Sequence, residues 1–185
     1  MQPPKLLPYA TAFVAILHAG VVHAGDEKST ALAAALFAHV PAASLPAPDR
    51  VAIADLTPLT LKGGRVVSKL PGCDREPMDA EAQVVDLNGD RQPEVFVMAG
   101  NTCTSGMTGI SVRLYARQRD GTWIQLLDVI APAYRVLPST SHGWRDLALA
   151  SRTSSCVGVW RLGDDGRYRY TRSEAADGGP CPDRH

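Results

Sequence analysis

The apolar positions of this chain follow two different periods. In the segment 32–40, apolar residues recur three or four positions apart, Ser29 or Thr30 can cap a helix there, and Pro41 ends it. This spacing predicts one N-terminal amphipathic helix that packs onto the body of the domain. The proline-rich segment 41–48 predicts an extended connector after it.

From residue 51 onward, short runs rich in β-branched and other apolar residues alternate with turn signals. The clearest hairpin signal is Asp120-Gly121, which separates two such runs. We expect strands at residues 51–53, 59–61, 65–67, 84–85, 95–98, 110–116, 122–129, 144–150, 157–162 and 168–171. Strands this short and regularly punctuated predict a mainly β fold of antiparallel sheets.

The first 24 residues carry a targeting signal. Lys5 gives a short basic start, residues 6–17 are predominantly apolar, and residues 22–24 are small or permissive. We therefore expect residues 1–24 to be a cleaved secretory signal peptide. The apolar run is too short for a convincing membrane span, so we expect none after cleavage.

Composition agrees with an exported domain, periplasmic or secreted. Nineteen basic and nineteen acidic residues balance, and removal of Lys5 with the signal leaves eighteen basic residues and a charge of about −1, which argues against nucleic-acid binding. The four cysteines form no C-x-x-C motif, and an even number in an exported chain favours two disulfides. Of three possible pairings we favour Cys73 with Cys103 and Cys156 with Cys181, because these close the shorter loops.

The strongest candidate for chemistry is the loop 86–94, which lies between two expected strands. Oxygen atoms occupy its relative positions 1, 3, 5, 7 and 9: the side chains of Asp86, Asn88, Asp90 and Glu94 and the backbone carbonyl of Gln92. Calcium takes six to eight oxygen ligands, and a donor set without His or Cys disfavours zinc. The loop therefore predicts a structural Ca²⁺ site. The same residues also favour a hairpin turn without a metal.

The loop resembles the aspartate-rich calcium loops of the FG-GAP and VCBS repeat families, in which D-x-N-x-D-G-x-x-[DE] precedes one β-strand of each propeller blade. The acidic and amide positions match, whereas Arg91 stands where the family usually has Gly. The resemblance implies antiparallel sheets built from propeller-blade-like units, with calcium bound at the loop.

A second, degenerate copy of this unit follows in the chain. Aligning residues 94–97 with 146–149 brings Cys103 next to Cys156, and, with a gap of several residues, the two Asp-Gly turns at 120 and 165 also align. The calcium ligands are absent from the second copy. Two units are too few to close a propeller, so we expect an open or sandwich-like pair of sheets. We expect a signal peptide, a helix with its connector and a single β domain over residues 1–24, 25–48 and 49–185, with units at about 84–130 and 136–172.

The sequence contains few motifs that indicate catalysis. The chain has no Gly-x-Ser-x-Gly, His-Glu-x-x-His or phosphate-loop motif, so we assign no catalytic residue. Ser141, His142 and Asp146 are close in sequence and suggest a hydrolytic cluster, but a polar turn is the simpler interpretation.

Three functions stay open on these grounds. The first is a calcium-stabilised, non-catalytic binding domain that contacts another protein, such as a periplasmic inhibitor or immunity-type protein. The second is a structural accessory module of the cell envelope, and the third an unrecognised hydrolase. The glycine-rich turn 106–109 and the aromatic residues of the last third are candidate contact residues. The sequence identifies neither a partner nor an oligomeric state.

Overall fold

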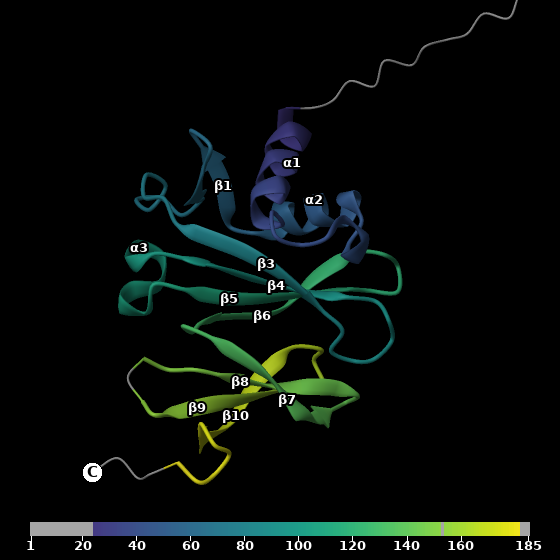
Figure 1. Cartoon of the computed structure of the whole chain (residues 1–185), viewed down its shortest axis with the longest axis vertical. Helices are drawn as coiled ribbons and strands as arrows, with labels where there is room; N and C mark the ends of the chain where they lie inside the picture. The colour runs from purple at the N-terminus through teal and green to yellow at the C-terminus, as the bar shows by residue number, and fades with distance from the viewer. Residues whose placement is uncertain (1–23, 153, 182–185) are drawn as a thin grey trace, which may run out of the picture.

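A computed structural model describes residues 24–152 and 154–181, which form three layers (Figure 1). In this part of the chain, ten strands form three antiparallel sheets, which confirms the predicted mainly β fold. The predicted signal peptide lies outside the described residues, apart from its last residue. No described helix is long and apolar enough to cross a membrane.

The N-terminal layer consists of helices and one hairpin. Its elements are α1 (Ala24–Leu36), the 3₁₀ turn η1 (Ala42–Ser44), α2 (Ala47–Leu56), β1 (Leu59–Lys62) and β2 (Arg65–Ser68). The strands β1 and β2 include the residues expected as strands, 59–61 and 65–67, and pair across a Gly-Gly turn. Ser29 and Thr30 lie within α1 rather than at its start.

The expectations for the segments 41–48 and 51–53 are wrong. The segment 41–48, expected as an extended connector, contains η1 and the first two residues of α2. Residues 51–53, expected as a strand, lie inside α2. Pro48 and Asp49 occupy the first turn of this helix, where proline needs no N–H partner and a carboxylate faces the positive end of the helix dipole. Ile53 and Ala54 are fully buried against α1 and the sheet below, so tertiary packing overrides the local β preference of the triplet.

The middle layer, which we call the first meander, is a four-stranded sheet. It contains β3 (Asp79–Val85), β4 (Glu94–Gly100), β5 (Ser111–Arg117) and β6 (Trp123–Ile130), paired in that order. β5 and β6 pair across the Asp120-Gly121 turn, as predicted. The short helix α3 (Thr102–Ser105) and the 3₁₀ turn η2 (Gly106–Thr108) connect β4 to β5.

The second meander has the same connectivity. It contains β7 (Tyr134–Ser141), β8 (Trp144–Leu149), β9 (Cys156–Leu162) and β10 (Tyr168–Ala175), again paired in chain order. Segments that align in the sequence lie on corresponding strands: Glu94 begins β4 and Asp146 lies in β8, and each Asp-Gly turn joins the third and fourth strands. In the described residues both sheets are open meanders, not blades of a closed ring.

Alternating side chains of the first meander fill two cores. Val95, Val97 and Tyr115 face α1, α2 and the β1–β2 hairpin. Phe96 and Leu114 face the other way and pack with residues of the second meander. The first meander is therefore buried on both faces, which explains why β4 is an almost continuous apolar run.

Two disulfides fix segments that lie outside or at the ends of the sheet strands. Cys73, after β2, pairs with Cys103 of α3, and Cys156, at the start of β9, pairs with Cys181 beyond β10. The favoured pairing is confirmed. Two disulfides in a small domain indicate an oxidising, extracellular compartment.

A buried carboxylate fixes α2 to the first meander. Asp49 is 9 % exposed; it accepts a hydrogen bond from Trp123 Nε1 at 3.0 Å and lies 3.4 Å from Arg117 Nη1. Replacing Asp49 by Ala leaves the buried indole N–H unpaired, so we expect the free energy of unfolding to fall by about 2 kcal/mol. Urea denaturation measures it. Asp55→Ala, on the exposed side of the same helix, is the control, and an equal loss in both variants would contradict the role of Asp49.

Candidate functional site

The predicted calcium loop joins β3 to β4, and its side chains organise its own backbone. Asp86 accepts hydrogen bonds from the N–H groups of Gly89 at 2.7 Å and Arg91 at 3.2 Å. Asn88 Oδ1 accepts from Asp90 N at 2.9 Å, and Asn88 Nδ2 donates to Asp90 Oδ2 at 3.0 Å. These hydrogen bonds, which include an Asx turn at Asn88, hold the side chains of residues 86, 88 and 90 within one compact loop.

Two loop residues adopt left-handed backbone conformations. Gly89 has φ +76°, which costs glycine little, but Arg91 has φ +67°. A left-handed conformation is uncommon for a residue other than glycine, so the hydrogen bonds of this loop hold Arg91 in a conformation that glycine adopts more easily. Gln92 is exposed, and its N–H donates to Asp90 Oδ1 at 2.7 Å.

Glu94 differs from the other candidate ligands because it is buried. Its side chain is 2 % exposed, and its Oε2 accepts a hydrogen bond from Leu87 N at 2.7 Å. Burial is the main cause that raises the pKa of Glu94 to about 7; the Leu87 hydrogen bond opposes this rise, and the negative charges of Asp90 and Asp86 contribute to it. Three carboxylates therefore lie close enough to repel one another, an arrangement that a cation relieves.

The donor set suits a hard cation, since it consists of carboxylate and amide oxygens alone. Within the described residues, however, no three Asp, Glu, His or Cys side chains are arranged around a common point as metal ligands are. Asp86 and Asp90 bond to loop amides instead. The convergence of the five ligands on one ion therefore stays a prediction.

Leu87 connects this loop to the second meander. Its N–H binds Glu94, its carbonyl accepts from Arg145 N of β8 at 2.8 Å, and its side chain is buried between the two sheets. Tyr168 of β10 donates to the carbonyl of Arg145 at 2.6 Å. Burial raises the pKa of Tyr168, and the nearby charges of Glu94 and Asp146 add to that shift. The loop thus lies at the junction of the two meanders.

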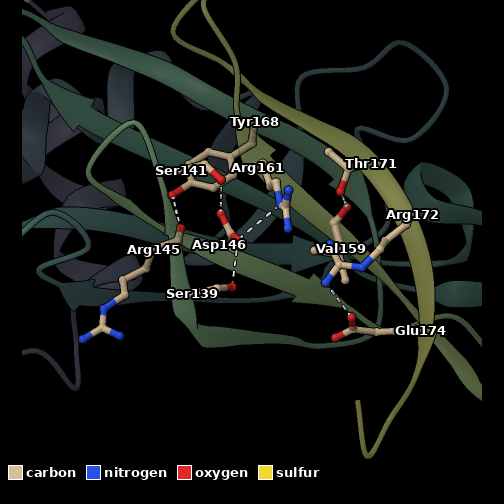
Figure 2. A network of polar contacts seen from close by, with 10 residues as sticks. All are labelled: Ser139, Ser141, Arg145, Asp146, Val159, Arg161, Tyr168, Thr171, Arg172 and Glu174. Atoms are coloured by element: carbon tan, nitrogen blue, oxygen red, sulfur yellow. Dashed lines mark hydrogen bonds and ion pairs between the residues drawn. The ribbon is translucent and has the colours of Figure 1, made fainter. Parts of the chain in front are cut away.

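Asp146, the counterpart of Glu94, is held by a separate network (Figure 2). It is 1 % exposed and accepts hydrogen bonds from Ser139 Oγ at 2.8 Å and Ser141 Oγ at 2.7 Å. Arg161 Nε lies 3.3 Å from Asp146 Oδ2, the oxygen that also accepts from Ser139. A buried carboxylate with two hydroxyl donors and a guanidinium is well compensated.

The contacts of this network show how the three residues of the suggested hydrolytic cluster are arranged. Ser141 and Asp146 are brought together, but they bond directly to each other. His142, with φ +52°, instead lies 3.5 Å from the exposed Asp164 in a solvent-facing pair. A serine nucleophile needs a base that accepts its proton and a group that orients the base. Ser141 and His142 do not form this arrangement, because Ser141 donates to Asp146 and His142 pairs with Asp164.

Sequence reasoning missed one polar pair. Arg113 in the middle of β5 lies 3.2 Å from Asp128 of β6, and its side chain is only 12 % exposed. The two residues are opposite in the hairpin register. An arginine within an apolar strand, facing an aspartate across a predicted hairpin, was the signal that could have identified the pair.

Comparison with known proteins adds no identification: the chain matches no protein-family model, no curated protein and no solved structure.

Proposed function

We propose that this protein is an exported, calcium-stabilised, non-catalytic binding domain, in which the calcium loop holds the junction of the two meanders. The observation that carries the proposal is the position of Leu87, whose backbone joins the candidate ligand Glu94 to β8. An ion that orders Glu94 would therefore order the contact between the sheets, at a distance from any partner.

The residues present fit calcium. Asp86, Asn88, Asp90, the Gln92 carbonyl and Glu94 would hold it, and the ion would supply the positive charge that three neighbouring carboxylates lack. We expect modest affinity, micromolar to millimolar, because only three charges and one amide are available. Few coordination positions would remain for a substrate, which favours a structural ion.

Export is supported by the disulfides and by the predicted signal peptide. The periplasm or the extracellular medium is the compartment we propose, and both supply the oxidising conditions that the disulfides need.

The equivalent strand positions of Glu94 and Asp146 support a blade-like origin for the two meanders. A stack of two such sheets leaves two outer faces to cover. The N-terminal layer covers one, and the other bears charged residues around Asp146, in the manner of a polar terminal repeat.

A partner-binding surface is offered by the connection between β4 and β5. Met107 is 90 % exposed there, between Gly106 at φ +56° and Gly109 at φ +75°. The nearby disulfide at Cys103 and the capping box of α3 fix the base of this loop. An exposed methionine on a well-anchored tip suits contact with another protein, as in an inhibitor or immunity-type role.

An affinity experiment with envelope extract tests this role. The mature protein is used as bait with Met107→Asp and with Leu56→Asp, a matched change at an exposed position of α2. We expect the parent protein and Leu56→Asp to retain the same partner in calcium and Met107→Asp to retain at least about tenfold less, since a central apolar anchor contributes 2 kcal/mol or more. Equal retention by both variants would rule out the Met107 surface, and no retained partner would favour a structural envelope module.

A further inference from the structure

A groove of about 250 Å³ lies between the β1–β2 hairpin and the first meander. Its walls are mainly apolar, and its floor carries charge; the lining residues that matter are Leu59, Leu70, Met78, Thr104, Arg113 and Asp128. The disulfide Cys73–Cys103 ties the segment that carries Leu70 to the helix that carries Thr104. Two walls of the groove are thus fixed covalently.

Arg113 is incompletely paired at the floor of this groove. Its side chain is 12 % exposed, and its contact of 3.2 Å with Asp128 does not have hydrogen-bond geometry, so the buried Nε has no hydrogen-bond partner. Within the described chain we find no hydrogen bond donated by its guanidinium. A buried donor without a partner is costly, and the guanidinium has further N–H donors that can face a ligand in the groove.

A second buried group beside Arg113 also lacks a partner. Tyr115 lies two residues further along β5 on the same face, is fully buried, and its hydroxyl has no hydrogen-bond partner. Burial raises its pKa to about 12, with a lowering influence from Arg113 and a raising one from Asp128. The hydroxyl therefore lies within electrostatic range of the charged pair.

Asp128 adds a negative charge to the lining of the groove. Its side chain is 45 % exposed and lines the opening, so one cationic and one anionic group face the same space. A net-charged ligand would satisfy one of them and oppose the other. A zwitterion satisfies both, and the apolar walls favour one with an apolar body.

We propose that this groove binds a small α-amino acid with an apolar side chain. The carboxylate lies on the Arg113 guanidinium, the ammonium on Asp128, and the side chain against Leu59, Leu70 and Met78. The groove is at the α3 end of β4, whereas the calcium loop is at the other end of that strand. Binding is therefore independent of the calcium site and of the function proposed above.

Thermal unfolding and calorimetry of the mature protein with L-alanine, L-valine and L-leucine test the proposal. At 100 times its Kd, the best of the three is expected to raise Tm by about 5–10 °C. Two analogues of leucine separate the charges: 4-methylpentanoate lacks the ammonium, and 3-methylbutylamine lacks the carboxylate. Each is expected to bind at least about tenfold more weakly than leucine, since a hydrogen bond to a charged group contributes about 1.5–3 kcal/mol.

Two variants locate the site. Arg113→Met keeps the chain length and is expected to weaken leucine binding about 10- to 100-fold, and Asp128→Asn about tenfold. Arg161→Met is the control, because Arg161 makes a similar ion pair of 3.3 Å with Asp146 on the far sheet and its Nε likewise has no hydrogen-bond partner, but it does not line this groove. This variant should bind leucine as the parent protein does. If Arg113→Met fails to fold, Asp128→Asn and the analogues still decide. Absence of binding by all three amino acids at 10 mM, or equal binding of leucine and its analogues, overturns the proposal and leaves only ordered water at Arg113.

Discussion

Reducing both disulfides is expected to lower the free energy of unfolding by about 7 kcal/mol, the largest effect of any change considered. The bonds close segments separated by 30 and 25 residues. The chain-entropy relation for loops of this length gives about 3.5 kcal/mol for each bond. Domains of this size are stable by only about 5–15 kcal/mol, so the reduced protein should be marginally folded or unfolded at 37 °C.

Circular dichroism during urea denaturation, with and without reductant, measures this loss. Cys73→Ser with Cys103→Ser, and separately Cys156→Ser with Cys181→Ser, apportion it between the two bonds. The first pair should also loosen the α3 segment, whereas the second should act on the end of β10. Free-thiol labelling of the native protein provides the check, and two or more reactive thiols in exported material would contradict the bonding pattern.

Much of the sheet architecture was predictable because its signals are local. Apolar runs on either side of Asp86-Leu87-Asn88 and the Asp120-Gly121 turn define strands and hairpins without any knowledge of tertiary structure. The cysteine pairing followed from loop length alone. The open pair of sheets followed from counting two repeat-like units, although their blade-like origin stays a proposal.

The errors and omissions share a physical cause, which is packing between layers. Residues 51–53 have β preference, but burial of Ile53 and Ala54 against α1 makes them helical. The Asp49–Trp123 bond joins residues 74 apart in sequence, and no spacing rule predicts it. The calcium loop shows the same limit: sequence spacing placed its donors on one loop, but it gave no indication that Leu87 would bind β8.

Each meander buries one acidic residue on its second strand, and the two acids are compensated in different ways. Asp146 receives two serine hydroxyls and the charge of Arg161, so its compensation is part of the chain. Glu94 receives one backbone N–H and faces two further carboxylates. A buried acid without a cationic partner costs free energy. In the first meander a calcium ion would therefore take the place that Arg161 fills in the second.

Calcium is accordingly expected to stabilise the mature protein by about 1.4–2.7 kcal/mol when present at 10 to 100 times its Kd. The corresponding rise in Tm is about 3–10 °C for a chain of this size. Glu94→Gln removes one ligand charge and the buried repulsion together. We expect it to be at least as stable as the parent protein in chelator, and to lose most of the rise that calcium gives.

Differential scanning calorimetry in calcium and in chelator measures both quantities. Asp90→Ala should also lose the calcium response, because it removes a ligand charge from the exposed part of the loop. Asp164→Ala is the control, since its side chain is 97 % exposed in the β9–β10 turn of the second meander, and this variant should keep the full response. The sheet junction should respond too: hydrogen exchange at Leu87 and Arg145 should slow in calcium if the ion acts through the Leu87 link. A calcium response that survives in Glu94→Gln and Asp90→Ala would place the ion elsewhere, and unchanged exchange at Leu87 would separate calcium binding from the junction.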